Sequence, residues 1–428
     1  MKYLIHTYGC QMNESDSERI AGILRSLGYK KASKEVEADL VVLNTCVVRQ
    51  SAQDRIYGKL KNLKKFQSQN PKLKTCVAGC MASLYPEKLK DKTDLIISIN
   101  DLPKLPQLLE RQNPECNLEG DYLSIRSHYQ SNYHAYIPIM TGCNNFCSYC
   151  VVPYARGREK SRPVEDIINE ITSLIKKGYK AITLVGQNVN SYRSEFRIKK
   201  QKSKQINFPT LLKIINSIPG DFWIWFVTSH PKDMSDELIN AIAKCKKVCH
   251  YIHLPVQAGN NKILKAMNRG YTRKHYINLI KKIQKKIPEA ALSTDMIVGF
   301  PGETKKQFQN TVNLFKKIKF DMAYIARYSP RPKTAAYRLK DDVLKQEKEK
   351  RWKILTGILK KTALEQNKKL VGKTVEVLVE KSKNNFGIGK TRGLKTIKFK
   401  SNKNLVGQIV KVKIIQAMPW ALKGKLIK

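Results

Sequence analysis

The chain has 428 residues, of which 80 are lysine or arginine and 35 are aspartate or glutamate, so its formal net charge is +45. This length predicts two or three domains, and a hydrophobic content of 42% excludes general disorder. The excess of positive charge favours a polyanionic partner, with nucleic acid first. A general enrichment of lysine on solvated surfaces is the alternative, because charge by itself names no partner.

Membrane and secreted classes are disfavoured. No apolar run approaches the ~20 residues needed to span a bilayer, and residues 1–10 are too short and too polar for a signal peptide. Ten cysteines without an export signal indicate metal ligation or redox chemistry, not a disulfide framework. We therefore expect a cytoplasmic protein without membrane association.

The first part of the chain alternates between strand and helix patterns, which predicts a small α/β domain with a parallel sheet over residues 1–118. Strands are expected at 2–5, 40–43, 75–78 and 94–99, and helices at 16–27, 52–66 and 86–90.

Three cysteines of this domain, Cys10, Cys46 and Cys80, each follow a predicted strand. Because the carboxyl ends of parallel strands meet at one edge of a sheet, these thiols could form a set of three metal ligands. Separate buried cysteines at strand ends are the alternative, which these residues leave open. The other cysteines outside the central motif are interpreted as ordinary thiols: Cys76, Cys116, Cys245 and Cys249.

The central part, assigned to residues 130–362, alternates again. Strands are expected at 136–140, 181–185, 223–226, 251–254, 293–298 and 322–325, with helices that include 164–177, 238–243, 275–286 and 304–317. Six such units, without the last two of a full barrel, predict an open, incomplete (β/α)6 barrel. In this architecture the loops after the strands carry the chemistry.

A cysteine triplet follows the first barrel strand. Cys143, Cys147 and Cys150 have the spacing C-x3-C-x2-C, with Tyr149 before the last thiol. A zinc site closes with four ligands, whereas three thiolates on a four-iron cluster leave one iron open to a small molecule. The alternative is three buried thiols that act as apolar residues. The polar residues between the sulfurs disfavour it.

Loops after three other barrel strands carry glycine together with amide or carboxylate side chains. The first contains Gly186 and Gln187, the second Gln257, and the third Asp295 and Gly299. Glycine lets the backbone approach a ligand, and the polar side chains offer hydrogen bonds. A tight turn explains any one of them as well. Their common position after strands is what predicts a shared ligand site.

Three further features are less specific. His230 in Ser-His-Pro is a possible proton donor or substrate contact, or a structural histidine. Arg331 lies between two prolines and suits a carboxylate or phosphate. The basic loop 193–205 is interpreted as a solvated insertion on the ligand face.

After a charged helix at 344–369, short strands at 375–380, 386–390, 396–399 and 410–415 with glycine at the bends predict a small closed β-barrel over residues 368–428. Phe386 and Phe399 offer stacking surfaces, and we expect Lys395 and Lys398 to contact RNA. A soluble or oligomer-forming barrel is the alternative. The basic residues of this region are Lys390, Arg392, Lys395, Lys398 and Lys400.

The motifs together resemble one enzyme family. The triplet with its aromatic residue, continued as C-S-Y-C-V-V-P-Y-A-R-G, resembles radical S-adenosylmethionine (SAM) methylthiotransferases. The words T-Y-G-C-Q-M-N, N-T-C and G-C-M-A resemble the amino-terminal domain of that family, and the segment 368–428 resembles its TRAM module, a small RNA-binding barrel. The resemblance implies an α/β methylthiotransferase domain, a radical-SAM barrel and an all-β TRAM barrel in sequence.

The resemblance also implies cofactors and site residues. Two [4Fe-4S] clusters are implied, one on Cys143, Cys147 and Cys150 and an auxiliary one on Cys10, Cys46 and Cys80. SAM contacts are implied for Tyr149, Gly186, Gln187, Gln257, Asp295 and Gly299. Substrate contacts are expected at Arg331, Lys395 and Lys398.

Among the subfamilies, these sequence motifs most resemble the MiaB type, which implies methylthiolation at C2 of N6-isopentenyladenosine at position 37 of tRNA. The triplet cluster would cleave SAM to a radical that removes the C2 hydrogen, the auxiliary cluster would supply sulfur, and another SAM the methyl group. Expected partners are the tRNA anticodon stem-loop and an electron donor such as flavodoxin or ferredoxin, with the chain a monomer. Alternatives are methylthiolation of threonylcarbamoyladenosine or of a ribosomal-protein aspartate, and a non-enzymatic RNA-binding metal protein.

Overall fold

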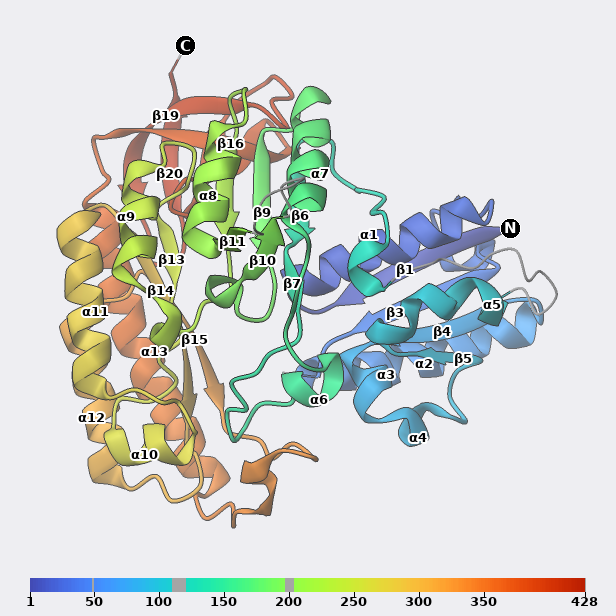
Figure 1. Cartoon of the computed structure of the whole chain (residues 1–428), viewed down its shortest axis with the longest axis horizontal. Coiled ribbons are helices and arrows are strands. Elements are labelled where there is room, and N and C mark those ends of the chain that lie inside the picture. Colours follow the sequence, from blue (N-terminus) through green and yellow to red (C-terminus); the bar gives the residue numbers. More distant parts are fainter. Residues whose placement is uncertain (48–49, 110–120, 197–203, 428) are drawn as a thin grey trace.

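A computed structural model describes residues 1–47, 50–109, 121–196 and 204–427. Figure 1 shows three parts: an amino-terminal sheet with its helices, a central set of strands ringed by helices, and a small barrel at the carboxyl end. The predicted fold class is confirmed in each part.

The amino-terminal part contains a five-stranded sheet in the order β2-β1-β3-β4-β5, in which every pairing is parallel. Its strands are β1 (Lys2–Tyr8), β2 (Lys30–Lys31), β3 (Leu40–Thr45), β4 (Lys74–Gly79) and β5 (Leu95–Ile97). Its helices are α1 (Gln11–Ser26), α2 (Gln50–Gln69), α3 (Cys80–Leu84), α4 (Pro86–Leu89) and α5 (Leu105–Leu109). Apolar side chains on both faces of the sheet form separate clusters, as a sheet covered by helices on both sides requires.

Helix α1 begins at Gln11, five residues before the predicted start at Asp16. Its first turns are polar but buried, so hydrophobic periodicity does not reveal them. They are buried because α1 packs on the edge of the central barrel, where Ser15 Oγ donates to Tyr136 O at 3.3 Å. Cys10 is thereby the residue that caps this helix.

The central part is an open arc of six parallel strands. Two three-stranded sheets, β12-β9-β6 and β13-β14-β15, are joined by a parallel bridge between Ile224 and Val248. The incomplete barrel is therefore as predicted. Its strands are β6 (His134–Pro138), β9 (Ala181–Val185), β12 (Trp223–Phe226), β13 (Tyr251–His253), β14 (Ala291–Val298) and β15 (Met322–Arg327).

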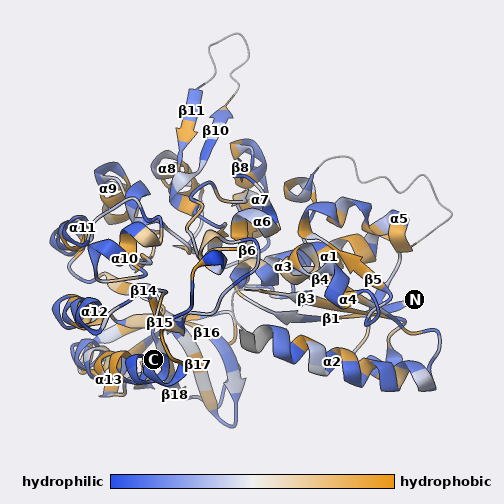
Figure 2. Ribbon diagram, turned by 90° about the horizontal axis from the view of Figure 1, so that it is seen from below, coloured by the Kyte–Doolittle hydropathy of each residue, from blue (hydrophilic) through white to orange (hydrophobic). Residues whose placement is uncertain are grey.

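Helices cover the outside of this arc, with their apolar sides toward the strands (Figure 2). They are α7 (Val164–Lys176), α8 (Phe208–Ser217), α9 (Asp236–Lys244), α10 (Asn261–Ala266), α11 (Arg273–Lys286) and α12 (Lys305–Ile318). Shorter elements near the site are β7 (Met140–Thr141), α6 (Val152–Arg156) and β8 (Lys160–Ser161).

The predicted basic loop contains an antiparallel hairpin of β10 (Arg193–Phe196) and β11 (Lys204–Asn207), which projects from the body in Figure 2. Residues 197–203 of that prediction, like Cys116, lie outside the described residues.

Helix α13 (Lys345–Lys368) leads to a closed five-stranded barrel in the order β16-β17-β18-β20-β19. The fifth strand was missed in the sequence, because its basic residues and central glycine hide the alternation of buried and exposed positions. The prediction that Phe399 offers a stacking surface is wrong, since its ring is in the barrel core. The strands are β16 (Thr374–Lys383), β17 (Phe386–Thr391), β18 (Thr396–Lys400), β19 (Ile409–Ala417) and β20 (Leu422–Leu426).

The small barrel packs against the amino-terminal ends of the central strands. The first residues of three strands, Ala181, Trp223 and Tyr251, lie in one apolar cluster with Leu378 of β16. The opposite ends of the central strands, where the predicted ligand loops begin, face away from this contact. Among the described residues, no helix has the length and apolar character to cross a membrane.

Candidate cluster and cofactor site

The central cysteine triplet lies on the loop between β7 and α6, and several hydrogen bonds from the segment after α10 hold it. Ser148 N donates to Met267 O at 3.0 Å, and Asn268 Nδ2 donates to Phe146 O at 3.0 Å. Phe146 itself has a positive φ of 45°, which bends the loop between the first two thiols. The three sulfurs are therefore carried by one short, braced loop.

The electrostatic surroundings of the triplet combine burial with nearby donors. Arg269 Nη1 donates to Cys147 Sγ at 3.2 Å, and Asn145 Nδ2 donates to Cys143 Sγ at 3.5 Å. Burial raises the pKa of Cys150 to about 12 and also raises that of Cys143. Buried thiols of this kind become thiolates when a cation compensates their charge, as metal ligation does. The donor set thus fits an iron–sulfur cluster.

The amino-terminal cysteines meet at one edge of their sheet. Tyr8, Thr45 and Gly79 are aligned across β1, β3 and β4, and each is the last residue of its strand. Cys46 and Cys80 come directly after two of these residues, and Cys10 follows Tyr8 by two positions. The Cys10 side chain is exposed, whereas the other two are buried. The fold therefore gathers three thiols that are far apart in the sequence.

Polar contacts hold these strand ends in place. Asn44 Nδ2 donates to Asn13 O at 2.7 Å, and Asn13 Nδ2 donates to Thr45 O at 3.4 Å. Gly79 has φ 97° and ψ −165°, a conformation that only glycine adopts readily. A Cβ there would lie 2.5 Å from Thr45 O, so glycine is also needed for space.

No group of three His, Cys, Asp or Glu side chains is arranged to hold a single metal ion in the described ranges.

Three predicted SAM residues come together at the carboxyl ends of the barrel strands. Gln187 Oε1 accepts a hydrogen bond from Gly142 N at 2.5 Å, directly beside Cys143. Gln257 N donates to Asp295 O at 3.0 Å, which places the loop after β13 against β14. The Asp295 carboxylate lies 3.6 Å from His253 Nε2. Gln187 and Gln257 lie on loops that follow strands, whereas Asp295 lies within β14. Amide and carboxylate groups of this kind can offer donors and acceptors to a ligand.

The other predicted SAM residues contact protein atoms. Tyr149 OH accepts from Arg269 Nη1 at 3.5 Å. A Cβ on Gly186 would lie 2.5 Å from Met140 Cγ, and a Cβ on Gly299 would lie 2.4 Å from Lys348 Cγ. Both glycines thus permit close packing between segments, and only Gly299 also has a positive φ, of 68°.

His230 and Arg331 are both buried. His230 Nδ1 accepts from Lys232 N at 3.2 Å, and burial lowers the ring's pKa to about 2, so the imidazole is neutral with its proton on Nε2. That Nε2 has no hydrogen-bond partner among the described residues.

A cavity of about 240 Å³ is lined by all three parts of the molecule. Gln11, the neighbour of Cys10, lies at one side, and Tyr136, Trp225 and Tyr324 of the central strands form an aromatic wall. Trp420 of the small barrel closes another side. Aromatic and polar side chains together suit a planar heterocycle.

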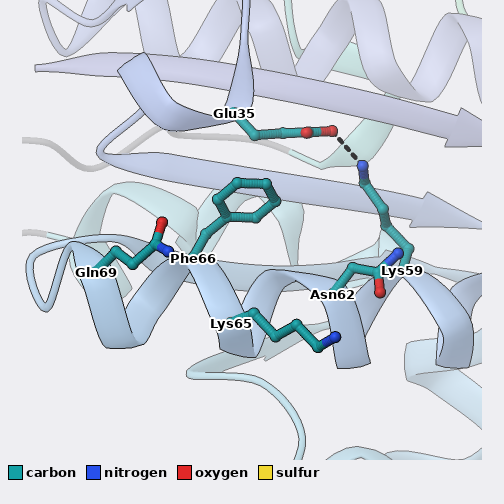
Figure 3. A pocket seen from close by; sticks show the side chains of 6 residues that line it. All are labelled: Glu35, Lys59, Asn62, Lys65, Phe66 and Gln69. Atoms are coloured by element: carbon teal, nitrogen blue, oxygen red, sulfur yellow. Dashed lines mark hydrogen bonds and ion pairs between the residues drawn. The ribbon is translucent and has the colours of Figure 1, made fainter.

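A larger hollow of about 460 Å³ lies between residues 35–37 and α2 in the amino-terminal part. Figure 3 shows Glu35 and Lys59 pointing toward one another, with Phe66 beside them. None of its lining residues is a predicted site residue, and we assign it no role.

The predicted RNA contacts of the small barrel differ from one another. Lys395 Nζ forms an ion pair with Asp321 Oδ1 at 2.5 Å and is largely buried between the barrels. Its side chain is therefore engaged in an intramolecular ion pair and does not face RNA. Lys398 is exposed, and its Nζ lies 4.0 Å above the Phe386 ring.

The small barrel has a lysine face of which only Lys398 and Lys400 were singled out in the sequence. Lys398 is paired with Lys423 across β18 and β20, and Lys413 is paired with Lys425 across β19 and β20. Like charges at paired positions repel, so such a face is stabilised by an anionic partner. In the sequence, the alternating pattern K-x-K could have indicated this face. The lysine face comprises the exposed residues Lys398, Lys400, Lys411, Lys413, Lys423 and Lys425.

Comparisons with known proteins match all three parts. Sequence profiles described as "Uncharacterized protein family UPF0004", "Radical SAM superfamily" and "TRAM domain" match residues 2–99, 137–315 and 368–427. A tRNA-2-methylthio-N(6)-dimethylallyladenosine synthase of Clostridium novyi is 44% identical, with 100% of this chain and 96% of that protein covered. The synthase of the same name from Acetivibrio thermocellus is 42% identical, with 100% and 91% covered.

Solved structures with low sequence identity share the fold. The radical SAM methyltransferase TsrM from Kitasatospora setae matches with a TM-score of 0.57 and 13% identity, covering 78% of this chain and 75% of that one. The cobalamin-dependent radical SAM enzyme OxsB matches with a TM-score of 0.51 and 11% identity, covering 82% and 56%. At these identities the matches show a shared fold over 78% and 82% of this chain.

Proposed function

Because the chain belongs to the family of tRNA-2-methylthio-N(6)-dimethylallyladenosine synthases within the radical SAM enzymes, we propose that it methylthiolates C2 of N6-isopentenyladenosine in tRNA. Its similarity to such synthases at 41–44% identity over essentially the whole chain carries this proposal. The modules we propose span residues 1–118, 130–362 and 368–428. We place the enzyme in the cytoplasm, as a monomer that takes electrons from a flavodoxin or ferredoxin.

Two [4Fe-4S] clusters have different roles in the proposed reaction. Cys143, Cys147 and Cys150 hold one beside SAM, and Cys10, Cys46 and Cys80 hold the other at the edge of the amino-terminal sheet. When bound, the first cluster supplies the electron that cleaves SAM and the second supplies sulfur. The protein's own contribution is position: one site on a braced loop and the other on strand ends, with the cavity's Gln11 next to Cys10.

SAM lies at the carboxyl ends of the barrel strands. Gln187, on the loop after β9, and Asp295, on β14, offer it hydrogen bonds, and Tyr149 lies within the triplet. Gln257 contributes through the backbone that joins its loop to β14. Gly186 and Gly299 act indirectly, by letting these loops pack closely.

The cavity that the three parts share extends from the small barrel to Gln11, next to Cys10, and takes the prenyl side of the target nucleoside, while C2 faces the carboxyl ends of the strands. An adenine that carries an apolar prenyl group needs flat aromatic walls and water exclusion, and Tyr136, Trp225 and Trp420 provide the former. The base must leave its stack in the anticodon loop to enter. Arg331 is proposed as a substrate contact deeper in the fold, where its fork suits an anionic or carbonyl group.

The tRNA backbone lies on the lysine face of the small barrel. Lys398 is the predicted contact that belongs to this face, whereas the ion pair of Lys395 with Asp321 orients the small barrel on the central one. Charged groups that track phosphates give binding that weakens steeply with salt.

The direct test is mass spectrometry of tRNA nucleosides from cells with and without the gene for this chain. The proposal predicts loss of 2-methylthio-N6-isopentenyladenosine and accumulation of its unthiolated precursor. Loss of the 2-methylthio derivative of threonylcarbamoyladenosine instead would transfer the activity to that nucleoside. Unchanged tRNA nucleosides would overturn the proposal.

A further inference from the structure

The first strand of the small barrel changes register beside the cavity that the three parts share. Along β16, Val377 and Val379 lie in the core of the small barrel, whereas Leu378 between them packs on the central strands. The pairing of β16 with β17 shifts between Val379 and Lys381, which makes Glu380 the extra residue of a β-bulge. A bulge re-aims side chains and is common next to binding sites. Glu380 accordingly lines the cavity.

Among the described residues, four charged side chains line this cavity, and three of them have partners in the protein. Lys395 Nζ pairs with Asp321 Oδ1 at 2.5 Å, and Lys390 Nζ donates to a threonine hydroxyl at 2.7 Å. The half-buried Glu380 carboxylate accepts no hydrogen bond and forms no ion pair in the part of the chain that the structure describes. A carboxyl in such a place is stabilised when a ligand donates to it. Glu380 is thus the charged group of the cavity that a ligand can engage.

The neutral part of the lining indicates what kind of ligand fits. Tyr136 and Trp225 offer flat aromatic surfaces on the central strands, and Trp420 offers one on the small barrel. His134 Nε2 and Thr183 Oγ1 lie 2.8 Å apart and satisfy one another. A flat heterocycle that stacks on such walls presents its edge to the remaining polar groups. The lining therefore suits an aromatic base with a hydrogen-bond donor on its edge.

An adenine with one substituent on N6 has this donor. Its N6 carries a single hydrogen, which lies between the flat ring and the apolar prenyl group. Because the prenyl side of the target nucleoside enters the cavity in the proposed reaction, this N6–H is the donor that is carried inside. Glu380 meets it from the small barrel, on the strand that faces the central part.

We propose that Glu380 is a specificity-determining residue, whose carboxyl group accepts a hydrogen bond from the N6–H of the target adenine. This inference deepens the proposed function and rests on it. It predicts that a base without a hydrogen at this position is bound poorly, even when its shape and its prenyl group are kept. The aromatic walls select the prenyl group, and Glu380 selects the nitrogen that carries it.

Both protonation states of Glu380 can make this contact. Burial raises the pKa of the carboxyl, and the positive charge of Lys390 acts in the opposite direction. An ionised carboxylate accepts with both oxygens, and a protonated one still accepts with its carbonyl oxygen. The contact is therefore tested by removing the acceptor and not by changing the pH.

A purely structural role for Glu380 makes a different prediction. Its neighbour Lys390 is aligned with Leu378 across β16 and β17, so the two charged side chains could help to hold the small barrel in place. Loss of that role would weaken the binding of all RNA ligands to the same degree. Only a contact with N6–H makes the effect of the substitution depend on the atom at this position of the base.

The test compares two synthetic anticodon stem-loops that differ in one group. One carries N6-isopentenyladenosine at the target position, and the other carries the same prenyl group linked through an ether oxygen, which has no hydrogen. Fluorescence titration of full-length, anaerobically reconstituted protein measures both affinities. Glu380→Ala and Glu380→Met remove the acceptor, the second with the side-chain length kept, and Glu380→Gln retains an amide oxygen. Glu376→Ala is the matched control, because Glu376 is an exposed carboxylate on the same strand that does not line the cavity.

We expect the parent to bind the N–H stem-loop about tenfold more tightly than the ether stem-loop, since a hydrogen bond to a charged acceptor is lost and two acceptors then face one another. In Glu380→Ala and Glu380→Met the two affinities should agree within about twofold. Glu380→Gln should keep part of the preference, and Glu376→Ala all of it.

Two outcomes would overturn the inference: equal affinities of the parent for both stem-loops, or a preference of parental size in Glu380→Ala and Glu380→Met. Melting curves confirm that each variant is folded, and either of the two variants without an acceptor is sufficient for the comparison. Methylthiolation of the N–H stem-loop by the parent is measured in parallel. A parent that leaves it unmodified would overturn the proposed function, whereas modification without the binding preference would overturn this inference alone.

Discussion

The two sets of three cysteines are built in opposite ways. The central set lies on one loop, braced by hydrogen bonds from the segment after α10, so its geometry is mostly local. The amino-terminal set comes from the ends of three neighbouring strands, and its geometry exists only when β1, β3 and β4 are paired in register. The central site thus depends on a short sequence motif, whereas the amino-terminal site depends on a correctly paired sheet.

This difference predicts that SAM cleavage and methylthiolation can be separated by substitutions, and that the two cluster sites differ in their sensitivity to disruption of the sheet. A substitution in the loop should affect SAM cleavage first. A substitution that disturbs the sheet should empty the auxiliary site and leave the central one in place.

The largest expected effect is that of Cys147→Ala. Without this ligand the central cluster is not held, so both formation of 5′-deoxyadenosine and tRNA methylthiolation should fall below detection. Chromatography of deoxyadenosine from reduced protein with SAM measures the first. Cleavage at the parent rate would remove the triplet from the radical site. Cys76→Ala is the control, because Cys76 is a fully buried strand residue that holds no cluster in this account.

Cys46→Ala should separate the two reactions. We expect SAM cleavage within about twofold of the parent, since the central thiols are carried by a different loop and sites without shared partners act nearly additively, together with loss of methylthiolated product. Parallel assays of deoxyadenosine and of the modified nucleoside on the same preparation test this. Equal loss of both would contradict separate roles for the two sets.

Gly79→Ala probes the dependence on the sheet without touching a thiol. Its backbone conformation is one that alanine adopts at a cost of about 1–3 kcal/mol, and a Cβ would meet Thr45 O at 2.5 Å. We expect loss of auxiliary-cluster iron with the central cluster retained. Gly28→Ala is the matched control: Gly28 also has a positive φ, of 79°, but its Cβ would meet nothing within 4 Å. Similar iron loss in both variants would refute the register argument.

A smaller effect is expected on the RNA face. Replacing Lys398, Lys423 and Lys425 by Ala should weaken tRNA binding and reduce the slope of log affinity against log salt by about 2–3. Fluorescence titrations at several salt concentrations measure this. The triple variant of Lys65, Lys72 and Lys92, exposed on the amino-terminal part, is the control. An unchanged slope in the barrel variant would show that RNA binds to another part of the molecule.

Much of this organisation could be predicted from the sequence, because strands and motifs are local signals. The strands at Ala181–Val185 and Trp223–Phe226 were predicted with the bounds that the structure has. The triplet was found by spacing. The convergence of Cys10, Cys46 and Cys80 depended on an assumed strand order, which the structure supplies.

What the sequence did not reveal depends on tertiary contacts. The first turns of α1 are buried by polar contacts and carry no apolar period. Arg156 stood inside the motif without a role, because its partner Asp16 is 140 residues away in the chain. Lys395 looked like an RNA contact until the packing of the small barrel placed it against Asp321.

The central claim is that two cluster sites exist on separate scaffolds. Iron and sulfide analysis of anaerobically reconstituted protein tests it most directly, on the parent, on the variant without the central three thiols and on the variant without Cys10, Cys46 and Cys80. The account predicts about eight irons per chain in the parent and about four in each variant. About four irons in the parent, with none left after loss of the central triplet, would contradict it.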